Sequence, residues 1–482
     1  MRQLLSQRID DVLDLDPTAP ALQFEGRWFT WGQVATATRR IGALTGQGRV
    51  GILLRNEPAH VAALLGVLAG GGTVVVINPS RGDDRARADL EALQLPVIIG
   101  LQADLATLAP TSHHATRITV TDLDTPPDVT QGSPPDDPGR PGVAVWMLTS
   151  GTTGPPKRVD LTYHMLARSV IGNDSEKCSS PTELRRGVTI VNSPLVHVGG
   201  VFRVLLCIAE ARPFVLLRRF ELDQWVLAVR EHRPRAVSLV PAALRMVLHS
   251  DLTRDDLAGV RVVTSGTAPL SADDADAFTE KFGIPVLTSY AATEFGGGVA
   301  GWTLADHEKY WRDKRGSVGR ANPGTRLRIV DHNGIPQEPG RQGLLEVIPA
   351  QMAETSEWMQ TTDLARIDAD GFLWILGRAD QAIIRGGFKV MPDDVRAALE
   401  THPAVQGAAV IGQPDPRLGE TPVALVELRT DTTASHDELL TFLRNRLARY
   451  EIPTEIVIVD AIPRTSSGKP DLTAVRSYFT QG

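Results

Sequence analysis

The chain has 482 residues, 42% of them hydrophobic and 22% charged, which is typical of a globular protein with a large buried core. At roughly 100 to 200 residues per domain, this length predicts two or more domains. The net charge of −7 gives no electrostatic reason to expect nucleic acid or an anionic membrane as the main partner.

The N-terminal stretch "MRQLLSQRIDDVLDLD" alternates apolar and charged residues at helical spacing. It lacks a continuous apolar segment and a small-residue cleavage site, so we expect no secretion signal. No run reaches the roughly 18 apolar residues of a membrane span, so no integral membrane segment is expected either. Two cysteines, Cys178 and Cys207, form neither a disulfide framework nor a metal cluster, and this usage favours a cytoplasmic location.

Strand and helix patterns alternate from residue 49 onward. Strands are expected at 49–54, 73–77 and 96–100, and helices at 58–71 and 85–93. Strand–helix–strand units of this kind predict a largely parallel sheet with helices on its faces. The alternation resumes with expected strands at 187–194, 213–217, 235–240 and 260–266. The fold class is therefore expected to be α/β.

The remaining segments divide the chain further. Residues 126–141 carry six prolines and predict an irregular surface connection, and a strand is expected at 143–150. Short strands with Gly and Pro turns at about 316–376 predict a small β-rich subdomain. A compact α+β unit with helices at 393–402 and 436–450 is expected to follow.

The loop "LTSGTTGPPKRV" (148–159) leaves the strand at 143–150, and open α/β sheets bind ligands at the carboxyl ends of their strands. Its Gly, Ser and Thr residues offer backbone N–H groups and hydroxyls to a phosphate, and Lys157 adds a point charge. It is not the usual nucleotide P-loop, because Pro156 replaces the second glycine and Arg158 follows the lysine. Taken alone, the loop fits either an anion cradle or a flexible surface turn.

A set of motifs resembles the adenylate-forming superfamily of acyl-CoA synthetases, peptide-synthetase adenylation domains and luciferases. "TSGTTGPPK" (149–157) is similar to its phosphate loop, and the other matches follow in the right order over nearly the whole chain. These are "SPLVHVGG" (193–200), "TSGTAPL" (264–270), "SYAATE" (289–294), "GSVGRANPG" (316–324), "TTDLARID" (361–368), "GRADQAIIRGGFKVMPDDV" (377–395) and "PRTSSGKPD" (463–471). The resemblance implies a large adenylation domain at 1–379 and a small mobile α+β domain at 380–482 that rotates about a hinge at Asp380.

The resemblance also implies the reaction. A small carboxylic acid reacts with ATP in the presence of Mg²⁺ to give an acyl adenylate, and the thiol of coenzyme A then displaces AMP. A member restricted to one half-reaction stays open, either delivering the acyl group to a carrier-protein phosphopantetheine or using an adenylate made elsewhere. A non-catalytic acyl- or nucleotide-binding protein is the alternative from a different class. A monomer or homodimer without nucleic acid is expected.

By resemblance, Lys157 would contact the β- and γ-phosphates, and Lys469 would bridge the acyl carboxylate and the α-phosphate. Glu294 is the candidate Mg²⁺ ligand, because Mg²⁺ takes few carboxylates and keeps phosphate oxygens and waters. His197 has two interpretations: it gates the acyl pocket, as in the family, or it is a satisfied core histidine. Lysine is scarce in this chain, with seven residues, and three of them (Lys157, Lys389 and Lys469) lie in motifs.

The resemblance implies further residues for the nucleotide and the pantetheine arm. Asp363 would accept the ribose hydroxyls, Arg378 would contact the ribose or a phosphate, and Lys389 would contact CoA. The complete set is Thr149, Ser150, Gly151, Thr152, Thr153, Gly154, Lys157, Gly266, Thr267, Ala268, Tyr290, Ala291, Thr293, Asp363, Arg378, Gly386, Gly387 and Lys389.

The last predictions concern the acyl pocket and three positions where the sequence differs from the family pattern. "SPLVHVGGVFRV" (193–204) has no aspartate to pair with a substrate ammonium, which favours an acid without an α-amine. Glycines at 199–200 and 296–298 predict room for a bulky acyl group. Arg158, Ala291 and Thr362 stand where the family has glycine, and their bulk is expected to crowd a nucleotide site lined by backbone.

Overall fold

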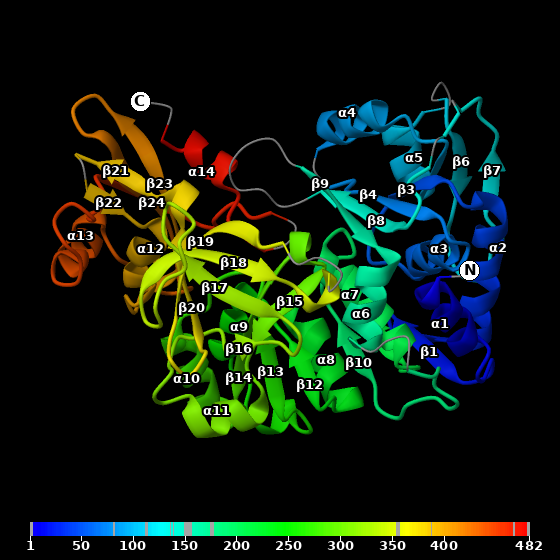
Figure 1. The fold of residues 1–482 in the computed structure, drawn as a ribbon, viewed down its shortest axis with the longest axis horizontal. Helices are drawn as coiled ribbons and strands as arrows, with labels where there is room; N and C mark the ends of the chain where they lie inside the picture. Colours follow the sequence, from blue (N-terminus) through cyan, green and yellow to red (C-terminus); the bar gives the residue numbers. More distant parts are fainter. Residues whose placement is uncertain are drawn as a thin grey trace.

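The computed structural model describes residues 3–80, 82–110, 114–134, 136–137, 139–148, 157–173, 178–352, 357–386, 388–465 and 468–479. It confirms the expected α/β class, with a large N-terminal domain and a small C-terminal one (Figure 1). Within the described part of the chain, no helix combines the length and apolar character needed to cross a membrane.

The first sheet has seven strands in the order β7-β6-β5-β3-β4-β8-β9. Five neighbouring strands, β6 to β8 in this order, run parallel, and β7 and β9 add antiparallel edges. The sheet is therefore mixed, and the proline-rich stretch contributes an edge strand where an irregular connection was expected. Its strands are β3 (Arg49–Leu53), β4 (Thr73–Ile77), β5 (Val97–Gly100), β6 (Thr116–Thr119), β7 (Asp128–Thr130), β8 (Val143–Leu148) and β9 (Arg158–Thr162).

Helices cover both faces of this sheet, so that β4 is buried along its entire length. Helix α3 is apolar on all sides and nearly completely buried, as expected for a helix in the centre of a domain. It packs tightly on α2 through Gly66, where a Cβ would lie 2.6 Å from the carbonyl oxygen of Thr38. The helices here are α1 (Leu4–Leu13), α2 (Trp31–Thr45), α3 (Pro58–Ala69), α4 (Asp83–Leu93), α5 (Gln102–Leu108) and α6 (Tyr163–Ile171).

Acid is expected to destabilise the protein through His60 of α3. Burial lowers the pKa of His60 to about 4, and its Nδ1 accepts a 2.9 Å bond from the backbone N–H of Arg55. In the unfolded chain His60 becomes protonated below about pH 6.5, whereas in the folded chain it becomes protonated below about pH 4. The free energy of unfolding therefore falls as the pH is lowered from about 6.5 to about 4. We expect the unfolding free energy to drop by about 2 kcal/mol between pH 8 and pH 5 from this residue.

Urea unfolding at the two pH values measures this loss in the natural protein and in His60→Asn, whose amide oxygen replaces the Nδ1 acceptor. Between pH 8 and pH 5, the unfolding free energy of the variant should fall by about 2 kcal/mol less than that of the natural protein. An equal pH dependence in both proteins would contradict the assignment to His60.

Two further sheets complete the α/β core. β12, β13 and β14 run parallel, and β15 and β16 follow antiparallel. A four-stranded sheet, β10-β11-β1-β2, brings the start of the chain beside residue 214. The strands are β1 (Pro20–Phe24), β2 (Arg27–Thr30), β10 (Thr189–Val191), β11 (Phe214–Leu216), β12 (Ala236–Ser238), β13 (Val262–Ser265), β14 (Val286–Ala292), β15 (Gly297–Gly301) and β16 (Arg320–Ala321). The helices are α7 (Val198–Ala209), α8 (Leu222–His232), α9 (Pro241–Leu248), α10 (Ala272–Phe282) and α11 (Leu304–Tyr310).

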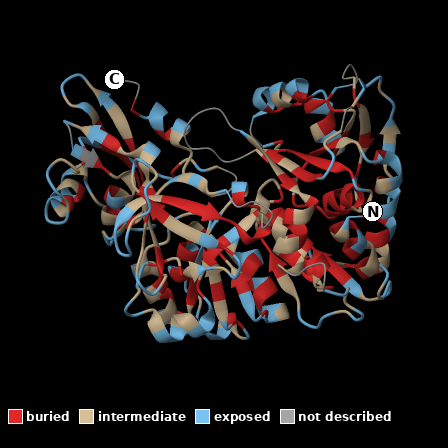
Figure 2. Cartoon of the chain, in the orientation of Figure 1, coloured by how far each residue is buried: buried red, intermediate tan, exposed pale blue. Residues whose placement is uncertain are grey.

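An antiparallel sheet, β17-β18-β19-β20, lies between this core and the C-terminal domain (Figure 1). Its strands are β17 (Arg326–Val330), β18 (Gln342–Ile348), β19 (Met359–Ile367) and β20 (Leu373–Arg378). Buried residues concentrate in the strands and in the helices packed on them (Figure 2).

The C-terminal domain has its own core between a five-stranded sheet and two helices. Strand β24 is central to it and pairs with β21, β23 and β25. After α14 the chain ends, while the segment before α14 reaches back toward the middle of the molecule (Figure 1). The elements are β21 (Ile383–Arg385), β22 (Phe388–Val390), α12 (Pro392–Glu400), β23 (Val405–Asp415), β24 (Gly419–Leu428), α13 (His436–Arg444), β25 (Glu455–Val459) and α14 (Leu472–Ser477).

Candidate active site

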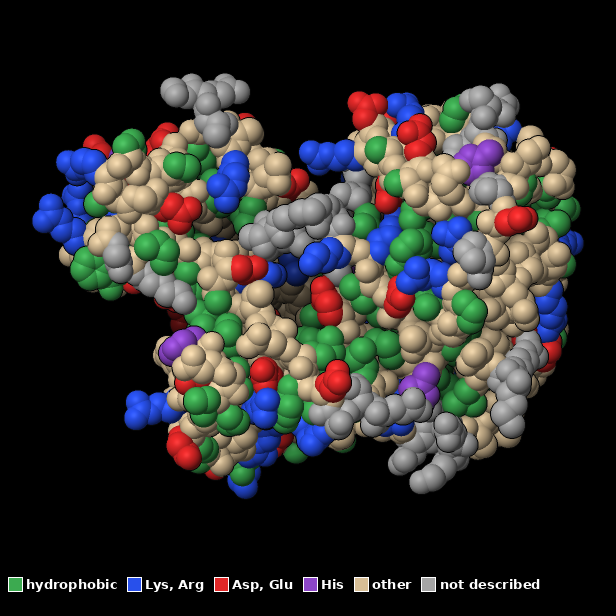
Figure 3. Space-filling model, turned by 45° about the horizontal axis from the view of Figure 1, so that its top comes forward, with side chains coloured by type: hydrophobic (Ala, Val, Ile, Leu, Met, Phe, Trp, Pro, Cys, Tyr) green, Lys and Arg blue, Asp and Glu red, His purple; other side chains and the backbone are tan. Residues whose placement is uncertain are grey.

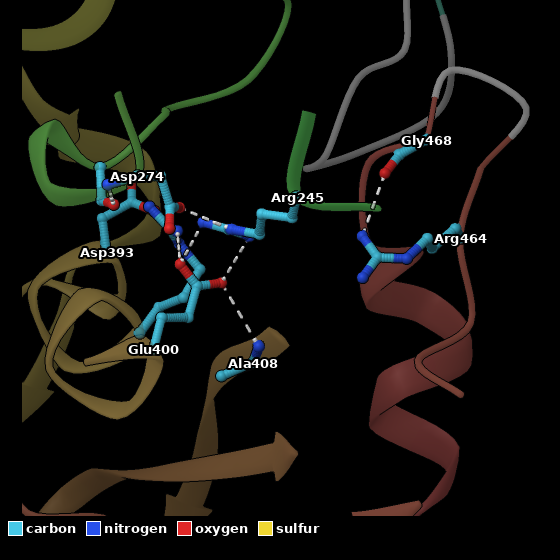
Figure 4. A network of polar contacts seen from close by, with 9 residues as sticks. Arg245, Asp274, Asp393, Glu400, Ala408, Arg464 and Gly468 are labelled. Atoms are coloured by element: carbon cyan, nitrogen blue, oxygen red, sulfur yellow. Dashed lines mark hydrogen bonds and ion pairs between the residues drawn. The ribbon is translucent and has the colours of Figure 1, made fainter. Parts of the chain in front are cut away.

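Lys469 lies in the segment that reaches back from the C-terminal domain. Its loop is closed by bonds from the Thr465 N–H to the Lys469 carbonyl (2.7 Å) and from the Gly468 N–H to the Thr465 carbonyl (2.9 Å). Arg464 donates to the Gly468 carbonyl at 3.2 Å (Figure 4). Gly468 has φ +80°, and a Cβ there would lie 3.7 Å from Val240 of the large domain. The two domains therefore meet at the lysine loop.

The Lys469 ammonium lies near side chains of both positive and negative charge. Burial lowers its pKa, and the nearby Arg378 guanidinium lowers it further, whereas Asp363 and Glu294 act in the opposite direction. Within the described residues, no carboxylate forms an ion pair with this ammonium. Two cations thus share a partly buried site, an arrangement suited to binding an anion between them.

Asp363 of β19 and Arg378 of β20 are paired directly across the ladder. The Tyr290 hydroxyl of β14 donates to Asp363 Oδ2, and Arg378 forms two bonds to Asp380, of 2.9 Å from Nε and 2.7 Å from Nη2. Burial raises the pKa of Asp363, while the Tyr290 bond and Arg378 oppose the rise. Tyr290 is the sole hydrogen-bond donor to the Asp363 carboxylate among the described side chains, so Oδ1 keeps its capacity to accept.

Glu294 and Thr293 lie in the short 3₁₀ turn Thr293–Phe295 that follows β14. Glu294 is exposed, and its charge acts on both Lys469 and Arg378. No group of three or more His, Cys, Asp or Glu side chains suited to a metal occurs among the described residues. A single carboxylate fits Mg²⁺, which completes its shell with phosphate oxygens and waters.

His197 is the N-cap residue of α7. Burial lowers its pKa to about 4, and the Lys469 ammonium adds to that effect. The imidazole is therefore neutral at pH 7 and lies close enough to Lys469 to sense its charge. This position is the one expected of a residue that borders the acyl pocket, and the role of His197 there stays a prediction.

The structure says less about several of the predicted site residues. Residues 149–154 and Gly387 lie outside the described residues, as does the side chain of Lys389. Lys157 is exposed just before β9. Thr267, flanked by Gly266 and Ala268 after β13, has φ +70°, which is uncommon for a β-branched residue and typical of a functional loop. Gly386 has φ +57° in the turn before β22.

Arg158 has buried partners of its own, and its effect on the nucleotide site stays a prediction. Its guanidinium turns to the sheet edge, where it pairs with Asp89 at 2.6 Å and donates to the Val76 carbonyl at 3.1 Å. Its side chain is almost fully buried there, so it braces β9 against α4 and β4. Ala291 and Thr362 are exposed, and their effect on the nucleotide stays a prediction.

The prediction that the glycines at 199–200 and 296–298 leave room for a bulky acyl group is partly wrong. A Cβ on Gly200 would lie 2.2 Å from the Pro194 carbonyl oxygen, and one on Gly296 would lie 2.6 Å from Met165 Cε. A Cβ on Gly297 would similarly lie 2.7 Å from a side-chain nitrogen of Gln351. These three glycines permit close packing, whereas a Cβ on Gly199 would meet no described atom within 4 Å.

Two features escaped the sequence prediction. Arg203 of α7 lies on the same helix face as Gly199, a spacing of four that the sequence does contain. An ion network around Arg245 joins the two domains (Figure 4), and no local sequence signal marks it. In the space-filling view, basic and acidic side chains surround a hollow near the middle of one face (Figure 3).

Residues 10–355 match the family model described as AMP-binding enzyme, and residues 394–469 match the AMP-binding enzyme C-terminal domain. The chain belongs to the AMP-binding enzyme family. The feruloyl-CoA synthase of an Amycolatopsis species is 30% identical and covers 96% of this chain and 97% of its own. The indoleacetate–CoA ligase of Aromatoleum aromaticum is 28% identical, with 99% and 98% covered. The resemblance and the expected acid–CoA ligase activity on acids without an α-amine are confirmed.

Two solved structures of one protein share the fold of this chain. The ATP-bound form of MatB from Rhodopseudomonas palustris superposes with a TM-score of 0.83 at 23% identity, covering 100% of this chain and 99% of that one. The apo form gives a TM-score of 0.68 at 24% identity and 99% coverage of both chains. The fold is therefore shared over nearly the whole chain.

Proposed function

We propose that this family member converts a carboxylic acid without an α-amine into its acyl adenylate and then into its CoA thioester, using ATP and Mg²⁺. The observation that carries the proposal is the position of Lys469. It comes from the C-terminal domain and lies, without an ion-pair partner among the described residues, next to Arg378, Asp363 and Glu294. A site of this charge pattern suits a reaction that brings two anions together.

In the first step, a carboxylate oxygen of the acid attacks the α-phosphorus of ATP, and the bond to pyrophosphate breaks. Lys469 and Arg378 supply fixed positive charge where the carboxylate and the α-phosphate meet, which stabilises the transition state. The neutral imidazole of His197 borders the acid without competing for its charge. Glu294 would hold Mg²⁺, which neutralises phosphate charge when bound.

Asp363 is suited to holding the ribose. A carboxylate oxygen accepts hydrogen bonds, and Tyr290 already fixes Oδ2, which leaves Oδ1 directed at the sugar hydroxyls. The bond from Tyr290 also orients the carboxylate, so less motion is lost when the nucleotide binds. Tyr290 would therefore act as a positioning residue for the nucleotide.

In the second step, we propose that the C-terminal domain turns about Asp380 and withdraws Lys469. The CoA thiol then gives up its proton and attacks the acyl carbonyl carbon, and AMP leaves. Arg378 and Asp380 are joined by two hydrogen bonds next to this hinge, which supports a defined pivot. The segment with Gly386, Gly387 and Lys389 would then line the path of the pantetheine arm.

The partners follow from the same site. We propose that the protein acts as a monomer or a homodimer. A protein that merely bound an acyl or nucleotide ligand would have no need for a lysine delivered from a second domain. We propose free CoA as the acceptor and the cytoplasm as the location, where both CoA and ATP are available.

Incubation with ATP, Mg²⁺, CoA and a panel of acids tests the function, with AMP and thioester measured by mass spectrometry. The expected result is AMP and acyl-CoA in equal amounts, both dependent on the acid. AMP without thioester would favour a carrier protein as acceptor. Thioester formed exclusively from a preformed acyl adenylate would indicate a one-step member, and no product in either assay would contradict an enzymatic role.

A further inference from the structure

Arg203 stands out on one face of α7. Most residues of this helix are buried, but Gly199, Phe202, Arg203 and Leu206 are partly accessible. Their spacing of three and four residues places them on one face of the helix. The same face begins beside His197, and a Cβ on Gly199 would meet no described atom. Space is therefore open at Gly199, next to the place where the acid's carboxylate is proposed to lie, whereas Phe202 and Leu206 pack against the hydrophobic core.

The guanidinium of Arg203 reaches the neighbouring strand. Its Nη2 donates to the Thr264 hydroxyl of β13 at 3.2 Å, one residue before the Ser265 that ends this strand. Arg203 thus spans the gap between the helix that carries His197 and the strand that leads to Gly266. These two elements are the expected walls of the acyl pocket.

No described carboxylate pairs with this guanidinium. Burial lowers the pKa of Arg203, and the Cys207 thiol is the sole group that opposes the fall. Arg158 and Arg245 have acidic partners, Asp89 for the first and Asp274 with Glu400 for the second. Arg8 instead donates to three backbone carbonyls, whereas the hydrogen bond of Arg203 is to one hydroxyl. Arg203 is partly accessible, and a partly buried guanidinium without a counter-ion is stabilised when an anionic ligand binds to it.

We propose that Arg203 receives a second anionic group of the acid, so that the preferred substrate is dianionic at neutral pH. This inference rests on the proposed function. Arg203 lies six positions after His197, which corresponds to about 9 Å along the helix axis, and helical side chains lean back toward the N-terminus. The acid therefore carries its second carboxylate or sulfonate within about 9 Å of the carboxylate that reacts. A planar fork of donors suits such a group, which it can bind with two hydrogen bonds.

The test compares α,ω-dicarboxylates from succinate to suberate with their monomethyl esters, and sulfonate-bearing acids with equally long uncharged ones. ATP–pyrophosphate exchange is measured for the natural protein, Arg203→Leu and Arg203→Lys. We expect the natural protein to prefer a dianionic acid, and Arg203→Leu to lower its kcat/KM on the order of 100-fold. For the matching ester, kcat/KM of Arg203→Leu should stay within about threefold of the natural protein. With the dianionic acid, kcat/KM of Arg203→Lys should lie between those of the natural protein and Arg203→Leu, because the ammonium keeps the charge but lacks the planar pair of donors.

Thermal unfolding separates this role from a structural one. Arg203→Leu removes a partly buried charge that has no counter-ion among the described residues, so its melting temperature should equal or exceed that of the natural protein. The dianionic acid should raise the melting temperature of the natural protein and have no effect on Arg203→Leu. A variant that melts lower and loses activity on diacid and ester alike would overturn the inference.

The outcomes also distinguish the inference from the function beneath it. Exchange that is robust with monoanionic acids, shows no preference for a second charge and is unchanged in Arg203→Leu overturns the dianionic substrate and leaves the ligase intact. Absence of exchange and of thioester with every acid overturns both.

Discussion

Replacing Lys469 with alanine is expected to slow acid-dependent ATP–pyrophosphate exchange by about 100- to 1000-fold. The ammonium is the positive charge that the C-terminal domain brings to the site, where it lies beside Arg378. Its loss leaves the incoming carboxylate and the α-phosphate to repel one another with one cation fewer between them. Isotope exchange from labelled pyrophosphate into ATP measures this step without any contribution from CoA.

The same variant should keep the second half-reaction. If the C-terminal domain turns away before the thiol attacks, Lys469 is absent from that step, and a preformed acyl adenylate should react with CoA at a rate within about threefold of the natural protein. Lys309→Ala removes an exposed lysine elsewhere in the large domain and serves as the matched control. Full exchange activity in Lys469→Ala would contradict the proposed role.

The interior of the fold is predictable from short patterns, but the edges of its sheets are not. The run 73–77 is apolar throughout because β4 is covered on both faces, and helix α3 beside it is apolar for the same reason. Whether an edge strand runs parallel or antiparallel depends on which strand it meets. The antiparallel edges β7 and β9 and the pairing of β1 with β11 lie outside any local pattern.

The site shows a similar division. Motifs predict residue types with a shared chemistry, and the structure brings Lys469, Asp363, Arg378, Glu294 and His197 together from widely separated segments. The direction of a side chain depends on partners that the motif does not contain. Arg158 pairs with Asp89, a buried carboxylate far upstream that no motif around the loop reveals. Arg203 becomes informative because no such partner is present among the described residues.

Glu400→Gln is expected to impair adenylation far more than thioester formation. Arg245 of α9 forms two bonds to Glu400 of α12, of 3.2 Å and 2.7 Å, and a third to Asp274 of α10 at 2.7 Å (Figure 4). Arg396 also donates to Glu400 at 2.7 Å. The side chains of Arg245 and Glu400 are 11% and 7% exposed, so this network is nearly dry and joins the two domains in the present arrangement.

Removing one charge from a buried pair typically costs about 3 to 5 kcal/mol when its partner is left without a counter-ion. Here we expect the lower end of that range, because Arg245 keeps its bond to Asp274. In this network the protein can escape that penalty by separating the domains, which returns Arg245 to water. The population then moves away from the arrangement that carries Lys469 into the site. Exchange is expected to fall on the order of 100-fold, while transfer from a preformed adenylate to CoA is kept or becomes faster.

Glu346→Gln provides the matched control for this prediction. Glu346 is equally buried, at 9% side-chain exposure, and pairs with Arg328 at 2.6 Å inside the large domain. Breaking that pair should lower the melting temperature but leave the ratio of the two half-reaction rates unchanged, because both partners stay in one domain. If both variants changed that ratio equally, or if neither did, the Arg245–Glu400 contact would be a structural pair without influence on domain orientation. If the ratio of the two rates changed in Glu400→Gln alone, the carboxylate of Glu400, which joins the two domains, would also control how long Lys469 stays in the site.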